Sequence, residues 1–215
     1  MKESIYILGV GYNTPVIMEI AELSGYKVDG LYHFEKGREG EKMHGVEIIG
    51  CNEDLLNSTD LNGVNFALSM GDNKIRTNIA EKLRSKGARL PKLIHPTASV
   101  SKYATIEEGV IIQANSTVQA DVLIKKDTVI SFNVGISHNT IIENGCYIAC
   151  QTIVGAYTHI LELSFIGMGV TIVSDKVPLI GRSAVVGAGS VVIKPVKNNQ
   201  TVVGNPAKEY NKKHE

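Results

Sequence analysis

The chain contains no tryptophan and few aromatic residues, and its 215 residues carry no excess charge of either sign. Its 22 Lys and Arg residues match its 22 Asp and Glu residues, so the composition gives no broad attraction to nucleic acid or to an anionic membrane. The apolar run in the N-terminal stretch MKESIYILGVGYN is too short for a signal peptide or a membrane span. We therefore expect a cytoplasmic protein with no nucleic-acid or membrane partner.

Cysteine is also scarce. Cys51, Cys146 and Cys150 are odd in number and show neither a disulfide nor a zinc-ligand spacing, which favours a reducing compartment. Because small thiols pack well among aliphatic residues, Cys146 and Cys150 are predicted to be buried rather than to bind a metal.

What the sequence has in abundance is a period of six residues. Every sixth residue is Ile or Val at positions 94, 100, 106, 112, 118, 124, 130, 136, 142, 148, 154, 160, 166 and 172. The residue four positions after each is mostly small or β-branched, as at Ala98, Ser116 and Thr140. The pattern pauses at SDKVPL and resumes with isoleucine or valine at positions 180, 186 and 192.

One large and one small inward position in every six residues is typical of a parallel β-helix built from hexapeptides. Three hexads make one triangular coil, and successive coils stack about 4.8 Å apart. A β-sandwich would instead show alternation at period two and hairpin turns, which are missing. Since the core of a β-helix has little internal volume, ligands must bind outside it. In the hexad that begins at Ile136, His138 is predicted to point outwards.

Residues 1–90 are predicted to form a small, Rossmann-like α/β domain, ahead of the β-helix and C-terminal extension of residues 91–215. The stretch SIYIL reads as a strand that is followed by a glycine-rich turn, a helix and a second strand. VNFALSM reads as a third strand and RTNIAEKLRSKG as the next helix.

The glycine-rich turn is a weak signal for phosphate. Gly9 and Gly11 permit a tight turn at a helix N-terminus, where backbone N–H groups favour phosphate. The same G-x-G pattern also serves backbone geometry alone, and Thr14 stands where a dinucleotide fingerprint would have glycine. The helix after the turn is expected to present one apolar face made of Val16, Ile20 and Leu23.

Taken together, these stretches resemble the sialic acid O-acetyltransferase (NeuD-like) family, which includes the PglD-like nucleotide-aminosugar N-acetyltransferases of bacteria. The similar stretches are YILGVG, FALSMGDNKIR, LPKLIHPTASVSKYATIEEGVIIQANSTV, ISHNTIIENG, SAVVGAGSVVIKPV and VVGNPAK. The resemblance implies a left-handed β-helix, a homotrimer, and transfer of acetyl from acetyl-CoA to a nucleotide-linked 4-amino-4,6-dideoxyhexose for surface glycan biosynthesis. It also implies that the sugar nucleotide sits between the N-terminal domain of one subunit and the β-helix of its neighbour.

The resemblance places the catalytic histidine at His138, in an I-x-H hexad. An attacking amine must lose a proton, and imidazole, with an ordinary pKa of about 6.5, suits a base that works near neutrality. The next residue is usually acidic in the family but is Asn139 here, which can orient the ring without offsetting imidazolium charge, so we expect a weaker base. Backbone N–H groups near Gly155 and Ala156, one coil further on, are candidate donors to the developing oxyanion.

The expected acetyl-CoA contacts lie in later coils. Tyr147 replaces a histidine that the family often has nine residues after the catalytic one, and its hydroxyl is either a donor to the thioester carbonyl or a packing group. Glycine and alanine in IGMG and VGAGS permit close approach of a pantetheine arm to backbone amides. Two lysines either meet the phosphates or are solvated charges. The expected acetyl-CoA-binding residues are Tyr147, Gly155, Ala156, Gly167, Gly169, Gly187, Gly189, Lys194 and Lys208.

Substrate contacts are expected at the strand ends of the N-terminal domain. There the sequence departs from the family, with GYNTP in place of a GHG-like turn and YHFE in place of an acidic pair. The G-D-N stretch after VNFALSM is either a strand-ending turn or part of a ligand site. The expected substrate-binding residues are Gly9, Gly11, Tyr12, Asn13, Tyr32, His33, Gly71, Asp72, Asn73 and Arg76.

Two other functions stay open. A sugar O-acetyltransferase of the sialic acid type needs a stronger base than Asn139 favours, and a non-catalytic trimeric binding module would fit a degenerate site. A zinc-dependent β-helix enzyme of the γ-class carbonic anhydrase type is set aside, because His95, His138 and His159 do not repeat at coil spacing. No metal is expected.

Overall fold

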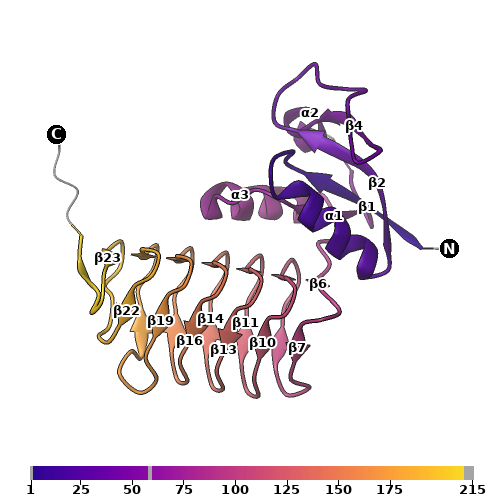
Figure 1. The fold of residues 1–215 in the computed structure, drawn as a ribbon. Coiled ribbons are helices and arrows are strands. Elements are labelled where there is room, and N and C mark those ends of the chain that lie inside the picture. Colours follow the sequence, from indigo (N-terminus) through magenta and orange to yellow (C-terminus); the bar gives the residue numbers. More distant parts are fainter. Residues whose placement is uncertain (1, 58–59, 211–215) are drawn as a thin grey trace, which may run out of the picture. The chain divides into compact units, whose positions relative to one another are not determined.

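The computed structural model describes residues 2–57 and 60–210 and divides the chain into two compact units, Met1–Leu93 and Ile94–Glu215. The N-terminal unit contains a five-stranded sheet of order β3-β4-β2-β1-β5 (Figure 1). All its pairings are parallel except β3 with β4. Its elements are β1 (Glu3–Leu8), α1 (Thr14–Leu23), β2 (Tyr26–His33), β3 (Lys42–Met43), β4 (Val46–Cys51), α2 (Asn52–Asn57), β5 (Asn65–Leu68) and α3 (Asn73–Arg84).

Two expectations about this unit need correction. The stretch predicted as the third strand is β5, because a hairpin of β3 and β4 and the helix α2 come before it. The hairpin turns at His44 and Gly45, whose φ angles of 47° and 84° suit a tight two-residue turn. The apolar face of α1 was also wrongly assigned, since Val16 and Leu23 are 37% and 50% exposed. The helix buries Thr14, Ile17, Met18, Ile20 and Ala21 instead.

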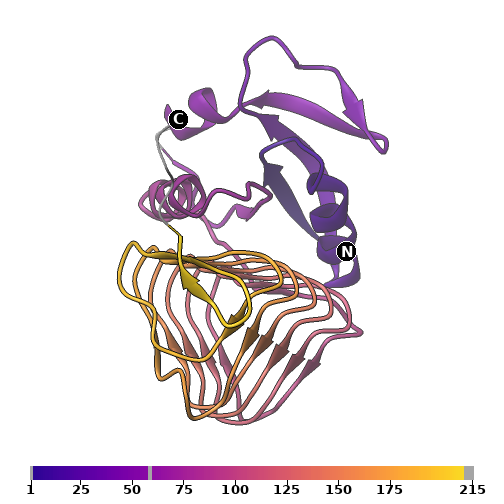
Figure 2. The ribbon, with the colours of Figure 1, turned by 60° about the vertical axis from the view of Figure 1, so that its left-hand side comes forward.

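The C-terminal unit is a three-sided prism of stacked coils (Figure 2). Its eight-stranded face contains β6 (Leu93–Ile94), β9 (Ile111–Ile112), β12 (Val129–Ile130), β15 (Tyr147–Ile148), β18 (Phe165–Ile166), β21 (Val185–Val186), β23 (Thr201–Val203) and β24 (Lys208–Glu209). Its six-stranded face contains β7 (Ser99–Val100), β10 (Thr117–Val118), β13 (Gly135–Ile136), β16 (Ile153–Val154), β19 (Thr171–Ile172) and β22 (Val191–Val192). Its five-stranded face contains β8 (Thr105–Ile106), β11 (Leu123–Ile124), β14 (Ile141–Ile142), β17 (His159–Ile160) and β20 (Leu179–Ile180).

The six-residue register predicts this core correctly. From Ile112 to Ile172, every residue on the register is at most 1% exposed, and the register resumes after SDKVPL with Ile180, Val186 and Val192 equally buried. Cys146 is buried in the same core, whereas Cys150 is half-buried. The predicted stacking of coils is confirmed. Strands one coil apart pair in parallel to form a column, as β9, β12, β15 and β18 do.

From Gly109 to Gly189, the corners of the prism turn through one residue with positive φ each. These residues are often Asn or Asp, as at Asn115, Asp121 and Asn133, with φ of 58°, 59° and 55°. Asn and Asp tolerate this left-handed conformation better than other residues with a side chain. We call the corner between the six- and five-stranded faces the His138 corner, and the one between the eight- and six-stranded faces the glycine corner.

A half-buried ion-pair cluster lies beside the five-stranded face. Glu143 contacts Lys125 Nζ and His159 Nε2, each at 2.8 Å, and its side chain is 18% exposed. Burial, the largest influence, raises the pKa of Glu143, but the hydrogen bonds from Lys125 and His159 outweigh it and hold this pKa below its usual range. The folded protein therefore binds fewer protons here than the unfolded chain does at acid pH.

Replacing Glu143 by Gln is expected to lower the free energy of unfolding by about 1 kcal/mol at pH 7. The wild-type contribution is fully present above the unfolded glutamate pKa of about 4.3 and is lost as the pH falls through the lower folded value. Thermal unfolding of both proteins between pH 7 and pH 3.5 tests this: the difference should shrink at the acid end. Glu108→Gln, which removes an exposed pair with Lys126, is the control and should have little effect at any pH. A Glu143→Gln difference that is independent of pH would contradict the assignment.

Candidate active site

His138 lies on the His138 corner with its imidazole exposed to solvent. Its Nδ1 is 2.8 Å from Oδ1 of Asn139. An amide oxygen only accepts, so Nδ1 carries a proton, and in the neutral ring the lone pair is on Nε2. Asn139 occupies the positive-φ position of the corner, with φ of 56°, so the fold itself favours an Asn or Asp beside the histidine. The pair therefore selects the tautomer in which Nε2 is the basic atom of the ring.

The neighbouring coils hold this histidine from both sides. The backbone N–H of His138 donates to Oε1 of Gln119 at 3.0 Å, one coil earlier. One coil later, the N–H of Tyr157 donates to the carbonyl of His138 at 3.3 Å, and the Tyr157 ring makes a T-shaped contact with the imidazole. Gln119 and Tyr157 were not predicted from the sequence, although the coil repeat places both positions next to residue 138.

The backbone N–H groups of Gly155 and Ala156, predicted as oxyanion donors, already donate hydrogen bonds within the β-helix. The N–H of Gly155 donates to the Ile172 carbonyl at 2.9 Å, and the N–H of Ala156 donates to Ser174 Oγ at 2.9 Å. Both residues are buried. This corrects the expectation that these two amides face the reaction centre, because both already donate to the coil that follows. The Ala156 amide differs from the Gly155 amide in that its acceptor is a side-chain hydroxyl.

Tyr147 is separated from His138 within one subunit. Tyr147 belongs to β15 on the eight-stranded face, where its ring stacks on Phe165 at 5.6 Å between centroids. The His138 corner joins the other two faces, so it lies opposite the eight-stranded face of the prism. Tyr147 and His138 can act on one acetyl group only if they come from different subunits.

The backbone N–H groups of the glycines at the glycine corner are also engaged in hydrogen bonds between coils. Gly167, Gly169, Gly187 and Gly189 donate their amides to carbonyls of neighbouring coils at 2.8–2.9 Å. A Cβ on Gly167 would lie 2.7 Å from the backbone nitrogen of Ala188. These four amides are therefore paired within the β-helix, and the predicted approach of a pantetheine arm to backbone amides at this corner would have to use other N–H groups.

Two other amides of this corner are better placed. The N–H groups of Met168 and Ala188, at the exposed tips of successive coils, donate no hydrogen bond within the part of the chain that the structure describes. Sequence reasoning missed them because it followed the glycines rather than the backbone pairing. Of the two lysines expected near phosphates, Lys194 lies beyond β22 and Lys208 in β24, and both are exposed.

The glycine-rich turn of the N-terminal unit is closed by hydroxyl groups. Gly9 has a φ of 88°, and its carbonyl accepts hydrogen bonds from Thr14 and Ser69. The amide of Gly11 donates to Thr14 Oγ1 at 2.9 Å, so this N–H is already used and does not face a phosphate. Tyr12 is fully exposed and Asn13 precedes α1 without capping it through its side chain. Thr14 thus fulfils a structural role in place of the missing glycine.

Tyr32 and His33 end β2. Tyr32 packs with Tyr6 and Phe66, and burial raises the pKa of its phenol. His33 is 3% exposed, and its Nδ1 accepts from the N–H of Glu35 at 2.9 Å. Both side chains therefore stabilise the strand end.

The G-D-N-x-x-R stretch is explained by local hydrogen bonds. Asp72 caps α3 by accepting from the N–H of Ile75 at 2.8 Å. Arg76 is 1% exposed and donates to the carbonyls of Met70 and Gly71 and, at 2.8 Å, to Asn73 Oδ1. The expectation that Arg76 contacts substrate is corrected, because its guanidinium is buried and locks the turn after β5.

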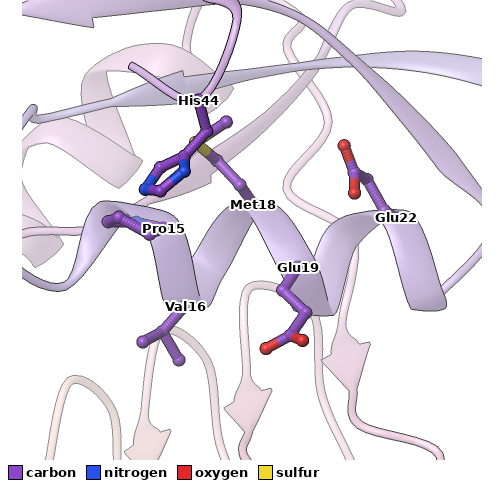
Figure 3. Close-up of a pocket in the computed structure, with 6 residues that line it drawn as sticks. All are labelled: Pro15, Val16, Met18, Glu19, Glu22 and His44. Atoms are coloured by element: carbon purple, nitrogen blue, oxygen red, sulfur yellow. The ribbon is translucent and has the colours of Figure 1, made fainter.

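A separate hollow of about 420 Å³ lies beside α1 (Figure 3). His44, from the β3–β4 turn, lies over the helix near Pro15 and Met18, and the lining residues are Pro15, Val16, Met18, Glu19, Glu22 and His44. None of the predicted site residues lines it. Across residues 2–57 and 60–210, no three His, Cys, Asp or Glu side chains are grouped as metal ligands, and none of the three helices has the length and apolar character needed to cross a bilayer.

Comparison with known proteins finds similarity to nucleotide-aminosugar acetyltransferases. Residues 4–83 match the PglD N-terminal domain family. The chain is 31% identical over 121 residues to UDP-N-acetylbacillosamine N-acetyltransferase of Bacillus subtilis (strain 168), a match that covers 52% of this chain and 52% of that relative. The match thus spans about half the length of this curated relative.

Among the solved structures that match almost the whole chain are two with a coenzyme bound. One is the acetyltransferase domain of PglB from Neisseria gonorrhoeae FA1090 in complex with acetyl coenzyme A, with a TM-score of 0.88, 28% identity, and coverage of 98% of this chain and 100% of that one. The other is PerB from Caulobacter crescentus in complex with CoA and GDP-perosamine, with a TM-score of 0.87, 25% identity and 97% coverage of each chain. They confirm the predicted fold of an α/β domain followed by a left-handed β-helix. Residues 4–83 match the PglD N-terminal domain model, and the chain as a whole resembles the PglD-like nucleotide-aminosugar acetyltransferases, as its motifs predicted.

Proposed function

We propose that this protein is an acetyl-CoA-dependent N-acetyltransferase that acts on a nucleotide-linked amino sugar of the 4-amino-4,6-dideoxyhexose type, for bacterial surface glycan biosynthesis. The observation that carries the proposal is the His138–Asn139 pair, which engages Nδ1 and leaves Nε2 of the exposed imidazole as the available basic atom. The relatives support the substrate class, since one is named for UDP-N-acetylbacillosamine and another binds CoA with GDP-perosamine.

The proposed chemistry uses Nε2 of His138 as the base. The sugar amine attacks the thioester carbonyl carbon, a C–N bond forms, and Nε2 takes the proton that the amine loses. When the intermediate collapses, the C–S bond breaks and the thiolate of CoA recovers that proton from the imidazolium, leaving neutral histidine and free CoA thiol. Asn139 holds the ring in the required tautomer throughout.

The coenzyme is proposed to follow the glycine corner. There the exposed amides of Met168 and Ala188 suit the amide oxygens of a pantetheine arm, and Lys194 and Lys208 are candidates for its phosphates. We propose a homotrimer, because only a second copy can bring the Tyr147 hydroxyl to the acetyl group beside His138. Acetyl-CoA as co-substrate and three cysteines without disulfides support a cytoplasmic location.

The nucleotide is proposed to bind the N-terminal unit at the strand ends. Of the predicted contacts, the exposed Tyr12 and the half-buried Asn13 in the turn stay candidates for its phosphates or sugar. Thr14 and Arg76 shape this surface without contacting the ligand.

The test is release of free thiol from acetyl-CoA with UDP-, dTDP- and GDP-linked 4-amino-6-deoxysugars, and with hydroxyl acceptors such as sialic acid alongside. Turnover on an amino sugar, with the product identified by mass spectrometry as an N-acetyl amide, is the expected result. Turnover on the hydroxyl acceptor alone would replace the proposal by O-acetylation. Binding of acetyl-CoA without turnover on any acceptor would favour the binding module.

Asn139→Asp is expected to move the acidic limb of the kcat/KM profile to higher pH by about one unit, because a carboxylate stabilises the imidazolium form. The fold should accept the change, since Asp121 and Asp175 adopt the same positive φ, 59° and 60°, at this corner. Initial rates between pH 5.5 and 9.5 measure the shift. Asn133→Asp, at the same turn position of the glycine corner, is the control. Superimposable profiles for wild type and Asn139→Asp would show that residue 139 does not act on the imidazole.

A further inference from the structure

Tyr157 contacts the imidazole of His138 from the next coil. The ring centroids are 5.4 Å apart and the planes meet at 89°, which is the edge-to-face geometry that aromatic rings prefer. The Tyr157 side chain is 58% exposed, so it contributes little to the buried core. Its position was not among those that the motifs identified.

The backbone of Tyr157 is in a conformation that suits other residues better. Its φ is 59°, and the same turn position of this corner is Asp121, Asn139 and Asp175 in three other coils. A bulky aromatic residue in the left-handed region is strained, and such strain is found where a side chain has a function. Strain alone does not settle the matter, because Leu163 has a φ of 60° at another corner. What distinguishes Tyr157 from Leu163 is the contact with the His138 ring.

The contact completes a restraint on the base. Asn139 fixes Nδ1 in the plane of the imidazole, and Gln119 holds the backbone N–H of His138. Neither prevents an exposed ring from rotating away together with its partner. Tyr157 packs against the ring, so it limits that rotation and keeps Nε2 in one direction, and a base held in one direction reacts faster than a mobile one.

We propose that Tyr157 is a positioning residue for His138. Tyr157 adopts an unfavourable positive φ at the corner, and its ring keeps the imidazole oriented. The proposal rests on the proposed acetyltransferase function for its effect on rate, but the contact itself is measurable without substrate.

The experiment compares Tyr157→Asn, Tyr157→Phe and Leu163→Asn with the wild type. Tyr157→Asn installs the residue type of the other coils, so the melting temperature should rise by about 2–4 °C while kcat falls about tenfold. KM for acetyl-CoA should stay the same, because the ring orients the base rather than the coenzyme. Tyr157→Phe keeps the aromatic ring and should retain kcat within about twofold. Leu163→Asn should gain similar stability with kcat unchanged.

A second readout follows the contact directly. In protein with ¹³C-labelled histidine, the ring-proton signals of His138, assigned by their loss in His138→Gln, should shift in Tyr157→Asn and stay in place in Tyr157→Phe. The proposal would be overturned if Tyr157→Asn kept the wild-type kcat or raised only the KM for acetyl-CoA. Equal losses of kcat in Tyr157→Asn and Tyr157→Phe would also overturn it. If the wild type transfers acetyl to no acceptor, the proposed function fails, and the His138 signals then decide: a shift in Tyr157→Asn supports the restraint, and no shift overturns it.

Discussion

Replacing His138 by Ala is expected to lower kcat for acetyl transfer by about 10²- to 10⁴-fold, the usual contribution of a general base. The amine nitrogen must lose a proton as it attacks the thioester carbonyl, and Nε2 of His138 is the basic atom that the corner presents. Because the imidazole is exposed, its loss leaves no cavity, so the melting temperature and the oligomeric state should not change. Steady-state rates with the reactive amino sugar, measured with calorimetry on the same samples, test both statements.

His159→Ala provides the matched control. His159 also points outwards from the β-helix, but it lies on the five-stranded face and pairs with Glu143. Its removal should leave kcat unchanged. If His138→Ala retains wild-type turnover, the base is another group and the assignment of the site is wrong. If both variants lose activity and also change their oligomeric state, the loss reports assembly rather than proton transfer.

The β-helix could be predicted from the sequence because its geometry repeats. In the column that contains Ile112 and Ile148, each residue packs against the residue one coil before it and one coil after it. The six-residue spacing in the sequence therefore identifies the whole core. The N-terminal unit offers no such repeat. The two-residue strand β3 and the turn at His44 and Gly45 leave only a weak pattern, and the hairpin was therefore missed.

The site was harder to predict because backbone amides leave no trace in a sequence. His138 and Asn139 could be identified from their motif, and the structure places them in contact. Which amides are available depends on pairing with the next coil, and the pairing uses Gly155 and Ala156 while it leaves Met168 and Ala188 exposed. Likewise, the G-D-N-x-x-R motif looks like a ligand loop until its hydrogen bonds are seen.

The same reasoning predicts a large stability effect at Gly167. Gly167→Ala is expected to lower the free energy of unfolding by about 3 kcal/mol. The added Cβ would lie 2.7 Å from the nitrogen of Ala188 and 2.8 Å from the carbonyl oxygen of Val186. Both are backbone atoms of the next coil, so no side chain can move aside and two coils must separate locally. A loss of this size corresponds to a fall of about 6–12 °C in melting temperature, which thermal unfolding at matched protein concentration measures.

Gly169→Asn separates this steric role from a coenzyme role at the same corner. Gly169 has a φ of 64° and no atom within 4 Å of an added Cβ, and Asn115 and Asn133 adopt the same conformation in earlier coils. The variant should keep its melting temperature within about 2 °C, because each lost or gained kcal/mol is worth only a few degrees. If Gly167→Ala is equally stable, the two coils are not in rigid contact, and the glycines of this corner are then selected by a ligand rather than by the stacking of the β-helix.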